Sequence, residues 1–278
     1  MSGLSLHAVI ISSRQLPALE ASVASCRDRI VSDASVTTKV SFVPYDAATR
    51  DDEGVSSATA IVDRVLALTE DRHVDRVFLN AGIYQLLPAL STPLDVSRRV
   101  ARVNYESPVE LAVTLLQERQ HKRPLHIIVV ASIISRGAHA LVSSYAASKH
   151  ALRGFFHTLA TELSGDTVRI DVACPAGTAT RLWENSGAPG VERHQLMSAR
   201  RVAWLIVTGA TGPYALFWET WIGQPIQLVW TATASYAPSL FQASALLFGW
   251  CRVQFWERDG TDVVDPLTLL RALFWKKK

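Results

Sequence analysis

The sequence predicts an α/β fold built on a doubly wound parallel sheet, because two kinds of segment alternate along its first 200 residues. Short β-branched apolar runs, bounded by polar residues, suit strands that are buried on both faces. Longer segments between them carry apolar residues at a helical period. Strand–helix alternation of this kind is typical of parallel sheets with helices on both faces.

The expected elements follow one another in a regular order. The strands are Ala8–Ile11, Val40–Val43, Val74–Leu79, Ile127–Val130 and Val168–Val172. The helices are Leu16–Arg29, Ser57–Thr69, Leu94–Arg119 and Ser143–Leu163. Ligands of open α/β sheets bind beyond the carboxyl ends of the strands, so the chemistry is expected directly after each apolar run.

The composition changes near residue 200, which indicates two regions, 1–200 and 201–278. From Val202 to Cys251 the only charged side chain is Glu219. Seven of the eight tryptophans lie at or beyond Trp204. Prolines and glutamines interrupt the second region, so we favour an apolar helical extension that rests on a membrane surface over one that spans the membrane. A buried core or an oligomer face is the other alternative.

Several classes of protein are excluded by composition. Of 278 residues, 49% are hydrophobic and 19% are charged, which argues against disorder. A net charge of +3 is too small to indicate a nucleic-acid partner. Three distant cysteines form neither a metal site nor a disulfide framework, so a reducing compartment and no bound metal are expected. The first residues lack the features of a signal peptide.

The polar residues of interest share a place directly after an apolar run or at the start of the next helix. Asn80-Ala81-Gly82 follows the third run, and Ser132 follows the fourth, thirteen residues before Tyr145. Tyr145 and Lys149 form a YxxxK pattern. The other positions of this kind are Arg14, Asp46, Pro175, Gly177, Thr178 and Thr180. Each motif alone is weak, whereas their conjunction is specific.

On these motifs, residues 7–182 resemble the short-chain dehydrogenase/reductase family. The resemblance implies a Rossmann-like sheet and a catalytic set of Asn104, Ser132, Tyr145 and Lys149. The stretch from Tyr145 to Leu163 and the segments around Met197 and Trp221 are similar to membrane-associated, retinal-type members of that family. Those members imply a retinoid-like or steroid-like lipophilic substrate, an endoplasmic reticulum membrane location, with the cytoplasm as the alternative, and a homodimer as a candidate assembly.

The residue types suit the interconversion of a carbonyl and an alcohol. Tyr145 would exchange the proton, although a phenol titrates only near about pH 10. Lys149 projects from the same helical face, so its ammonium would favour the phenolate. Ser132 would bind the substrate oxygen. By resemblance, Asn104 holds a water that passes protons toward Lys149.

The expected cofactor is NADP(H). In Rossmann-like sites an Arg accommodates the 2′-phosphate, and Arg14 follows the first apolar run with no acid before Glu20. Asp46 matches the family position beside the adenine. The full set of expected cofactor-binding residues is Arg14, Asp46, Asn80, Ala81, Gly82, Tyr145, Lys149, Pro175, Gly177, Thr178 and Thr180.

Each candidate also has an ordinary structural interpretation. A lone Tyr or Asn on a helix is usually a packing residue, and Ser132 alone would be a polar residue at a strand end. Asn80–Gly82 and Asp46 also suit turns, and Arg14 suits a solvated helix start. His150 is expected to be a surface or packing residue.

One feature departs from the family pattern, because no glycine lies between Gly3 and Gly54. By resemblance Ala8–Ile11 is the family's second strand, so the first βα unit and its glycine-rich phosphate loop are missing. Two explanations compete. The sequence is either a fragment of a working NADP(H)-dependent oxidoreductase, or a truncated, inactive protein that binds a membrane or a partner. In both, the absent central strand should expose apolar sheet edges.

Overall fold

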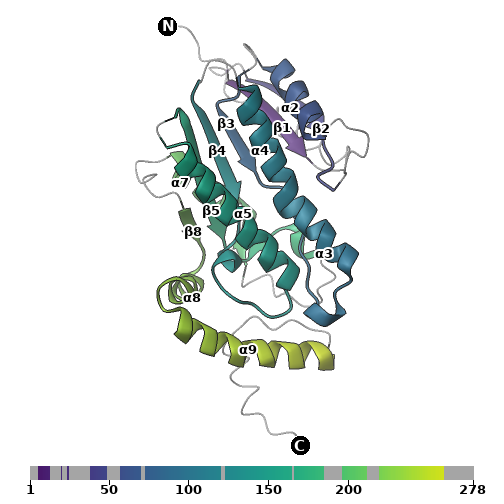
Figure 1. Cartoon of the computed structure of the whole chain (residues 1–278), viewed down its shortest axis with the longest axis vertical. Coiled ribbons are helices and arrows are strands. Elements are labelled where there is room, and N and C mark those ends of the chain that lie inside the picture. The colour runs from purple at the N-terminus through teal and green to yellow at the C-terminus, as the bar shows by residue number, and fades with distance from the viewer. Residues whose placement is uncertain are drawn as a thin grey trace, which may run out of the picture.

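The computed structural model describes the chain over residues 6–12, 20, 24, 38–48, 57–69, 73–119, 123–164, 166–184, 196–211 and 219–259. Its strands pair in parallel throughout, and several of its helices lie against the sheet, as Figure 1 shows. The prediction of an α/β fold with a parallel sheet is therefore confirmed. Of the predicted helix over 16–29 only residues 20 and 24 are described, and the cofactor candidate Arg14 lies outside the described residues.

The described strands form a four-stranded sheet and two pairs. The larger sheet has the order β3-β4-β5-β8, and β1 pairs with β2 and β6 with β7. The bounds are β1 Leu6–Ser12, β2 Thr38–Pro44, β3 Arg76–Leu79, β4 Leu125–Val130, β5 Val168–Pro175, β6 Thr178–Ala179, β7 Met197–Ser198 and β8 Glu219–Ile222. All five predicted strands fall within or overlap β1 to β5.

Strand β3 forms one edge of the larger sheet as described. It begins at Arg76, two residues after the predicted start, because its ladder with β4 runs only from Arg76 to Leu79. Phe78 on this strand is 45% exposed, whereas Leu79 is buried. No pairing joins β1 to β3 among the described residues. Phe78 is thus an exposed apolar side chain on this edge strand, and the exposure of apolar sheet edges through an absent strand stays a prediction.

The long predicted helix over 94–119 is continuous but irregular. It consists of α3 (Leu94–Ala101), a π-helical turn (Arg102–Glu106) and α4 (Ser107–Glu118). Pro108 near the start of α4 has no N–H to donate to the carbonyl four residues earlier, so a regular α-helical ladder is broken there. Such π turns inside helices often accompany functional residues, and this one contains Asn104.

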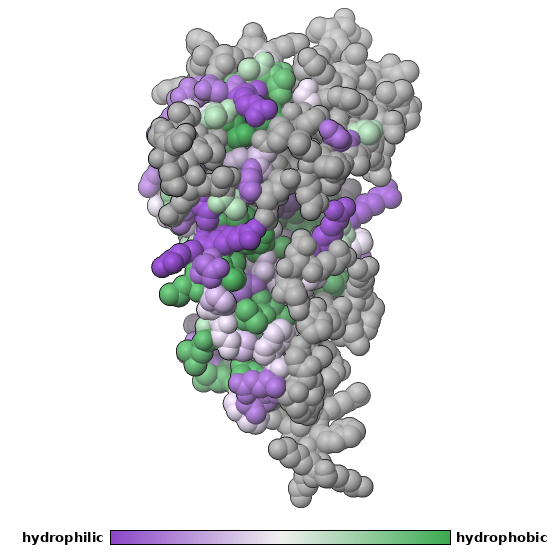
Figure 2. Space-filling view, turned by 90° about the vertical axis from the view of Figure 1, so that its right-hand side faces the viewer, coloured by the Kyte–Doolittle hydropathy of each residue, from purple (hydrophilic) through white to green (hydrophobic). Residues whose placement is uncertain are grey.

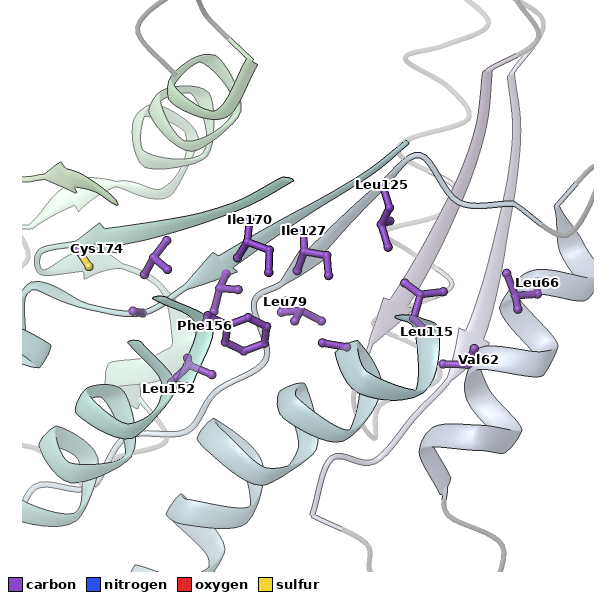
Figure 3. Packing of buried hydrophobic residues seen from close by; sticks show 14 residues of the cluster. Val62, Leu66, Leu79, Leu115, Leu125, Ile127, Leu152, Phe156, Ile170 and Cys174 are labelled. Atoms are coloured by element: carbon purple, nitrogen blue, oxygen red, sulfur yellow. The ribbon is translucent and has the colours of Figure 1, made fainter. Parts of the chain in front are cut away.

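The main core lies between the sheet and helices α4 and α5 (Ser143–Glu162). Ile127 and Val129 of β4 are fully buried and belong to one cluster with Phe156 of α5, which is also fully buried; Figure 3 shows Ile127 and Phe156 in this cluster. Burial of each such side chain contributes roughly 1.5–3 kcal/mol. A second cluster joins β2 to α2 (Ser57–Leu68) through Val43 and Ile61. These cores fix the carboxyl ends of β3, β4 and β5 against the start of α5.

The C-terminal helices cover one end of the sheet. They are α7 (Ala199–Thr211), α8 (Pro225–Tyr236) and α9 (Pro238–Asp259). Figure 1 shows α9 lying across the end of the molecule beside α8. Phe241 at the start of α9 is buried against the loop at Gly137. A Cβ added at Gly137 would lie only 2.3 Å from the Phe241 ring. Val253 and Trp256 of α9 pack against the cluster that contains Tyr145.

These helices expose large apolar side chains to solvent. Hydrophobic and hydrophilic residues lie side by side toward the end of the molecule at which α9 lies (Figure 2). The exposed residues on α8 and α9 are Val229, Tyr236, Leu240, Leu246 and Trp250. Within the described ranges, no helix combines the length and the hydropathy that crossing a membrane requires.

Candidate active site

Most of the predicted site residues lie at the carboxyl edge of the larger sheet. Asn80–Gly82 follows β3, Ser132 follows β4, and Pro175 ends β5. Because these strands are parallel, their carboxyl ends meet at one edge. Asn80 and Ala81 are exposed there, whereas Ser132 is buried.

Tyr145 and Lys149 lie one helical turn apart near the start of α5. Both side chains are buried, and Lys149 Nζ lies 5.9 Å from the centre of the Tyr145 ring. Lys149 Nζ donates a hydrogen bond to the carbonyl of Val130 at 2.9 Å, which holds the ammonium at the end of β4. The YxxxK spacing therefore places both groups beside the sheet edge.

Burial shifts the titration of both groups. It raises the pKa of Tyr145 to about 12, although a hydrogen bond with Ser132 acts in the opposite direction. It also lowers the pKa of Lys149 to about 8. In both cases removal from water disfavours the charged form. The resting site therefore holds a neutral phenol next to a lysine that titrates close to neutral pH.

Ser132 connects β4 to the short helix η4 (Ile133–Arg136). Its Oγ accepts from the amide of Ile134 at 3.3 Å and lies 3.4 Å from the carbonyl of Pro175, to which it donates. Its contact with Tyr145 lowers the pKa of that phenol. The structure thus brings Ser132 and Tyr145 together, as the sequence predicted.

Asn104 is fully buried and joins the sheet edge to α5. Its Oδ1 accepts from the amide of Ile83 at 2.8 Å, and its Nδ2 donates to the carbonyl of Ile83 at 2.9 Å. Nδ2 also lies 3.0 Å from Ser148 Oγ. A Cβ added at Gly82 would lie 3.4 Å from Asn104 Oδ1 and 3.7 Å from Lys149 Nζ. Gly82, Asn104 and Lys149 are therefore neighbours.

The segment after β5 forms a second side of the site. Thr178 Oγ1 donates to the carbonyl of Ala176 at 2.9 Å. Thr180 Oγ1 accepts from the amide of Leu182 at 3.3 Å, at the start of α6 (Arg181–Glu184). Gly177 lets the Leu196 side chain lie close to the backbone, since a Cβ at Gly177 would be 2.8 Å from Leu196 Cδ2. Both threonine hydroxyls thus take part in local turns.

Asp46 lies in the loop after β2. Its Oδ1 accepts from the amide of Ala48 at 2.9 Å, so the carboxylate forms an Asx turn. The turn role considered from the sequence is present, and a role beside adenine stays a prediction.

Sequence reasoning missed three residues that touch the candidate site. Tyr84 packs edge-on against Tyr145, with ring centres 4.7 Å apart. Trp183 lies 4.8 Å from Tyr84 and donates from Nε1 to the carbonyl of Thr178 at 2.7 Å. Ser148 Oγ lies 2.7 Å from the Tyr145 carbonyl, to which it donates. One signal was visible, because Trp183 is the only tryptophan before Trp204.

Glu219, the one acid of the apolar stretch, lies at the centre of a partly buried ion cluster. It accepts from Arg136 Nε and Arg153 Nε at 2.7 Å each, and from Trp221. His157 Nε2 lies 3.2 Å away. Burial raises the pKa of Glu219, but these donors outweigh it, so the pKa lies below its ordinary value. The cluster ties β8 to η4 and α5.

The fold and site define a Rossmann-like α/β protein with a tyrosine–lysine pair at the carboxyl edge of its sheet. The family model described as short chain dehydrogenase matches residues 7–189. The chain therefore belongs to the short-chain dehydrogenase family, and the resemblance seen in its motifs is confirmed.

The chain is similar to curated members of that family. It is 30% identical over 182 residues to the human dehydrogenase/reductase SDR family member 7. The match covers 62% of this chain and 52% of the relative. It is 30% identical over 178 residues to the rat member 7B. That match covers 64% of this chain and 52% of the relative. The chain thus spans about half the length of these curated relatives.

Solved structures share the fold. A short chain dehydrogenase from Salmonella enterica matches with a TM-score of 0.66 and 20% identity, over 78% of this chain and 85% of that chain. A short chain dehydrogenase from Burkholderia cenocepacia, solved in complex with NADP, matches with a TM-score of 0.59 and 22% identity, over 74% and 78%. At this identity the likeness shows the fold alone.

Proposed function

We propose that the chain interconverts a carbonyl and an alcohol on a lipophilic substrate with NADP(H). The observation that carries this proposal is the buried Tyr145–Lys149 pair beside Ser132 at the carboxyl edge of the sheet. Family membership supports the reaction class. The NADP bound to the Burkholderia relative supports the cofactor.

Tyr145 is the proposed proton donor during reduction. A phenol with a pKa raised to about 12 holds its proton at neutral pH, so it is ready to give that proton to a forming alkoxide. Oxidation requires the reverse transfer, for which the phenolate must be stabilised. A protonated Lys149 beside the ring would favour the phenolate, because a nearby opposite charge stabilises the charged form.

Ser132 and Asn104 support that transfer in different ways. Ser132 Oγ lies beside the phenol and would donate to the substrate oxygen as its charge develops. Asn104 is a positioning residue, because its side chain bonds both backbone groups of Ile83. It fixes the loop that follows β3 and lies beside Lys149. The water relay expected from the family resemblance stays part of this proposal.

The residues present fit the nicotinamide end of the cofactor. Lys149 supplies an ammonium at the sheet edge, and Gly82 leaves a side-chain-free approach beside it. When bound, NADPH supplies the hydride. We assign Asn80–Gly82 and the segment Pro175, Gly177, Thr178 and Thr180 to this end, Asp46 to the adenine, and Arg14 to the 2′-phosphate. Because no glycine lies between Gly3 and Gly54, we assign no residue to the pyrophosphate.

The C-terminal region, 201–278, is the proposed lid and membrane contact, and residues 1–200 form the proposed cofactor domain. Val253 and Trp256 of α9 pack against the Tyr145 cluster, which supports a lid over an apolar substrate. The exposed apolar residues of α8 and α9 support contact with a membrane surface. A retinoid-like or steroid-like substrate and an endoplasmic reticulum membrane location belong to the same proposal.

The proposal is tested with Tyr145→Phe in the full chain. Loss of the phenolic proton should lower NADPH-dependent carbonyl reduction by about 10²–10⁴-fold. Tyr236→Phe is the matched control, because Tyr236 is 83% exposed, and it should keep full activity. NADPH binding is measured in parallel by calorimetry. Activity retained in Tyr145→Phe would contradict the mechanism, and no NADPH binding by the unaltered chain would favour the inactive, membrane-binding or partner-binding alternative.

A further inference from the structure

The chain enters α5 through a strained backbone conformation. Among the described residues other than glycine, Leu141 alone has a φ in the left-handed region, at 69°, and it lies two residues before the helix begins. This conformation is unfavourable for an L side chain, because its Cβ crowds the following carbonyl oxygen. Leu141 is also buried. Contacts around it must therefore hold the strained backbone, as is common beside functional sites.

Two donors hold the Leu141 carbonyl. The side-chain amide of Gln85 donates to it from Nε2 at 3.0 Å, and the backbone amide of Leu87 donates at 2.9 Å. A carbonyl oxygen has two lone pairs, so both are used. The same Nε2 donates to the Leu87 carbonyl at 2.8 Å and lies 3.2 Å from Thr92 Oγ1. Gln85 therefore joins the loop after β3 to the residue at which the chain turns into α5.

Gln85 is fixed in place and is buried at a cost in free energy. It is 3% exposed, and Asn104 bonds both backbone groups of Ile83, two residues earlier. Gln85 Oε1 has no hydrogen-bond partner among the described residues. A buried acceptor without a partner destabilises the folded chain, and an apolar side chain of similar length would avoid that penalty. What the glutamine contributes at this position is its donor N–H groups.

Tyr145 depends on this contact because it lies in the first turn of α5. It is the third residue of the helix, and the amides of a first turn lack partners within the helix. The bond that closes the turn runs from the Ala146 amide to the Val142 carbonyl at 2.7 Å, directly after Leu141. Leu141, Val142 and Tyr145 also pack in one cluster. A change in the Leu141 backbone would therefore displace the phenol.

Lys149, by contrast, has its own anchors one turn further along α5. Its Nζ donates to the carbonyl at the end of β4 at 2.9 Å. Leu152 and Phe156 hold the following turns of the helix in the main core. A disturbance at Leu141 should thus move the phenol and leave the ammonium in place.

We infer that Gln85 is a positioning residue for the proton transfer. It holds Leu141 in the left-handed conformation and so fixes the first turn of α5, from which Tyr145 reaches the substrate oxygen. This inference rests on the proposed reductase function. It predicts that loss of the Gln85 amide lowers the rate of the chemical step without weakening cofactor binding, since Lys149 keeps its place.

The test replaces Gln85 by methionine, which has a similar length and cannot donate a hydrogen bond. All-trans-retinal and progesterone serve as carbonyl substrates, and kcat, KM and the Kd of NADPH are measured for the full chain. Gln85→Met should lower kcat by about 10- to 100-fold, as expected when a catalytic group is misplaced by about 1 Å. The Kd of NADPH should be unchanged, whereas a general loss of folding would raise it.

Thr92→Val is the matched control, because it removes one contact of Gln85 Nε2 and leaves the bond to Leu141. It should keep the kcat of the unaltered chain. If Gln85→Met does not fold, Gln85→Asn carries the same test, since its amide is one methylene closer to the backbone. An unchanged kcat in the Gln85 variant, an equal loss in Thr92→Val, or a loss of NADPH affinity that matches the loss of kcat would overturn the inference.

Hydrogen exchange separates this inference from the proposed function. In Gln85→Met the amides of residues 143–146 should exchange faster, whereas those of residues 152–160 should keep their protection. This difference is expected whether or not the chain reduces a carbonyl. Failure of the proposed function would appear as no reduction of either substrate by the unaltered chain, with the exchange difference still present. Equal exchange at the start of α5 in the two proteins would show that Gln85 does not hold it.

Discussion

The carboxyl edge of the sheet and the C-terminal helices differ in the forces that hold their residues in place. At the sheet edge, buried polar groups such as Asn104 and Lys149 are fixed by short hydrogen bonds. The helices α8 and α9 contribute apolar contacts, such as that of Phe241 against the Gly137 loop. Hydrogen bonds set direction, whereas apolar burial sets only proximity. The first region is therefore suited to position reacting atoms and the second to exclude water.

This comparison predicts its largest effect at Lys149, which serves chemistry at a cost to stability. Lys149→Met should lower carbonyl reduction by about 10²–10⁴-fold, since the phenolate loses its neighbouring cation. The free energy of unfolding should not fall, because a buried charge is replaced by an apolar chain of similar length. Steady-state kinetics and urea unfolding of the same preparation measure both. A stability loss that matches the activity loss would show that Lys149 has a structural role instead.

The pH dependence of stability provides a second readout for that variant. The folded-state pKa of Lys149 is lowered from 10.5 to about 8, so the unfolded chain binds more protons between these values. Stability should therefore rise with pH above about 8. Tyr145 acts oppositely above its ordinary value of 10.0, because its folded-state pKa is raised to about 12. Between about pH 8 and 10 the expected rise is about 2 kcal/mol, and Lys149→Met should abolish it.

Glu219 is the exception in the apolar region, and its replacement should give the next largest effect. Glu219→Gln leaves the partly buried Arg136 and Arg153 without their carboxylate, which should cost about 1.5–3 kcal/mol of unfolding free energy. Glu257→Gln on the exposed side of α9 is the matched control and should be nearly neutral. Urea unfolding at neutral pH checks both.

Acid titration sharpens the same prediction. The pKa of Glu219 is lowered from 4.5, so its contribution to stability is complete above that value and is lost as the pH falls through the lower folded-state pKa. The Gln variant should therefore lose less stability on acidification than the unaltered chain. If the Gln variant and the unaltered chain lost stability equally on acidification, the ion cluster would contribute nothing to the free energy of unfolding.

The apolar contact between the two regions should be broken by one methyl group. Gly137→Ala places a Cβ 2.3 Å from the buried ring of Phe241, and overpacking of this kind costs about 1–3 kcal/mol. Gly154→Ala is a matched control on α5, where an added Cβ meets nothing within 4 Å. It should stabilise the helix by roughly 0.5–1 kcal/mol. Thermal unfolding of both variants distinguishes a local clash from a general intolerance of alanine.

The parts of this molecule that the sequence predicted are those set by local patterns. The apolar runs gave the strands because each run is buried on both faces, as Ile127 and Val129 are. The YxxxK spacing placed Tyr145 and Lys149 together because one helical turn does so in any context. The π turn at Asn104 was not predicted, although Pro108, which breaks the ladder there, was visible.

The contacts that escaped prediction join residues far apart in the chain. Tyr84 meets Trp183, and Phe241 meets Gly137, only because the sheet and α9 bring them together. No periodicity or spacing encodes such pairs. Glu219 was noticed as an isolated charge, but its partners Arg136 and Arg153 lie more than sixty residues earlier in the chain. Composition identified the residue, and only the fold identified its role.

The smallest expected effect concerns the exposed apolar residues of α8 and α9, which precede the charged end of α9 that begins at Arg252. Glu219, the one acid between residues 202 and 251, is buried in its ion cluster. Binding to phosphatidylcholine vesicles should therefore be insensitive to salt, unlike the attraction of a basic surface to anionic lipid. Trp250→Ser should weaken vesicle binding about three- to tenfold, since one exposed apolar ring is lost.

Trp204→Ser is the matched control, because Trp204 is similarly exposed but lies on α7, away from α8 and α9 in Figure 1. Vesicle sedimentation measures both variants, and carbonate extraction of cell membranes complements it. Release of the chain at high pH agrees with surface docking, since such contact buries only side chains. Recovery in the soluble fraction before extraction, or equal loss of binding in the two Trp variants, would refute docking through α8 and α9. Another protein surface would then cover the apolar side chains of α8 and α9. A molecular mass in solution that rises with protein concentration would identify a second copy of the chain as that surface.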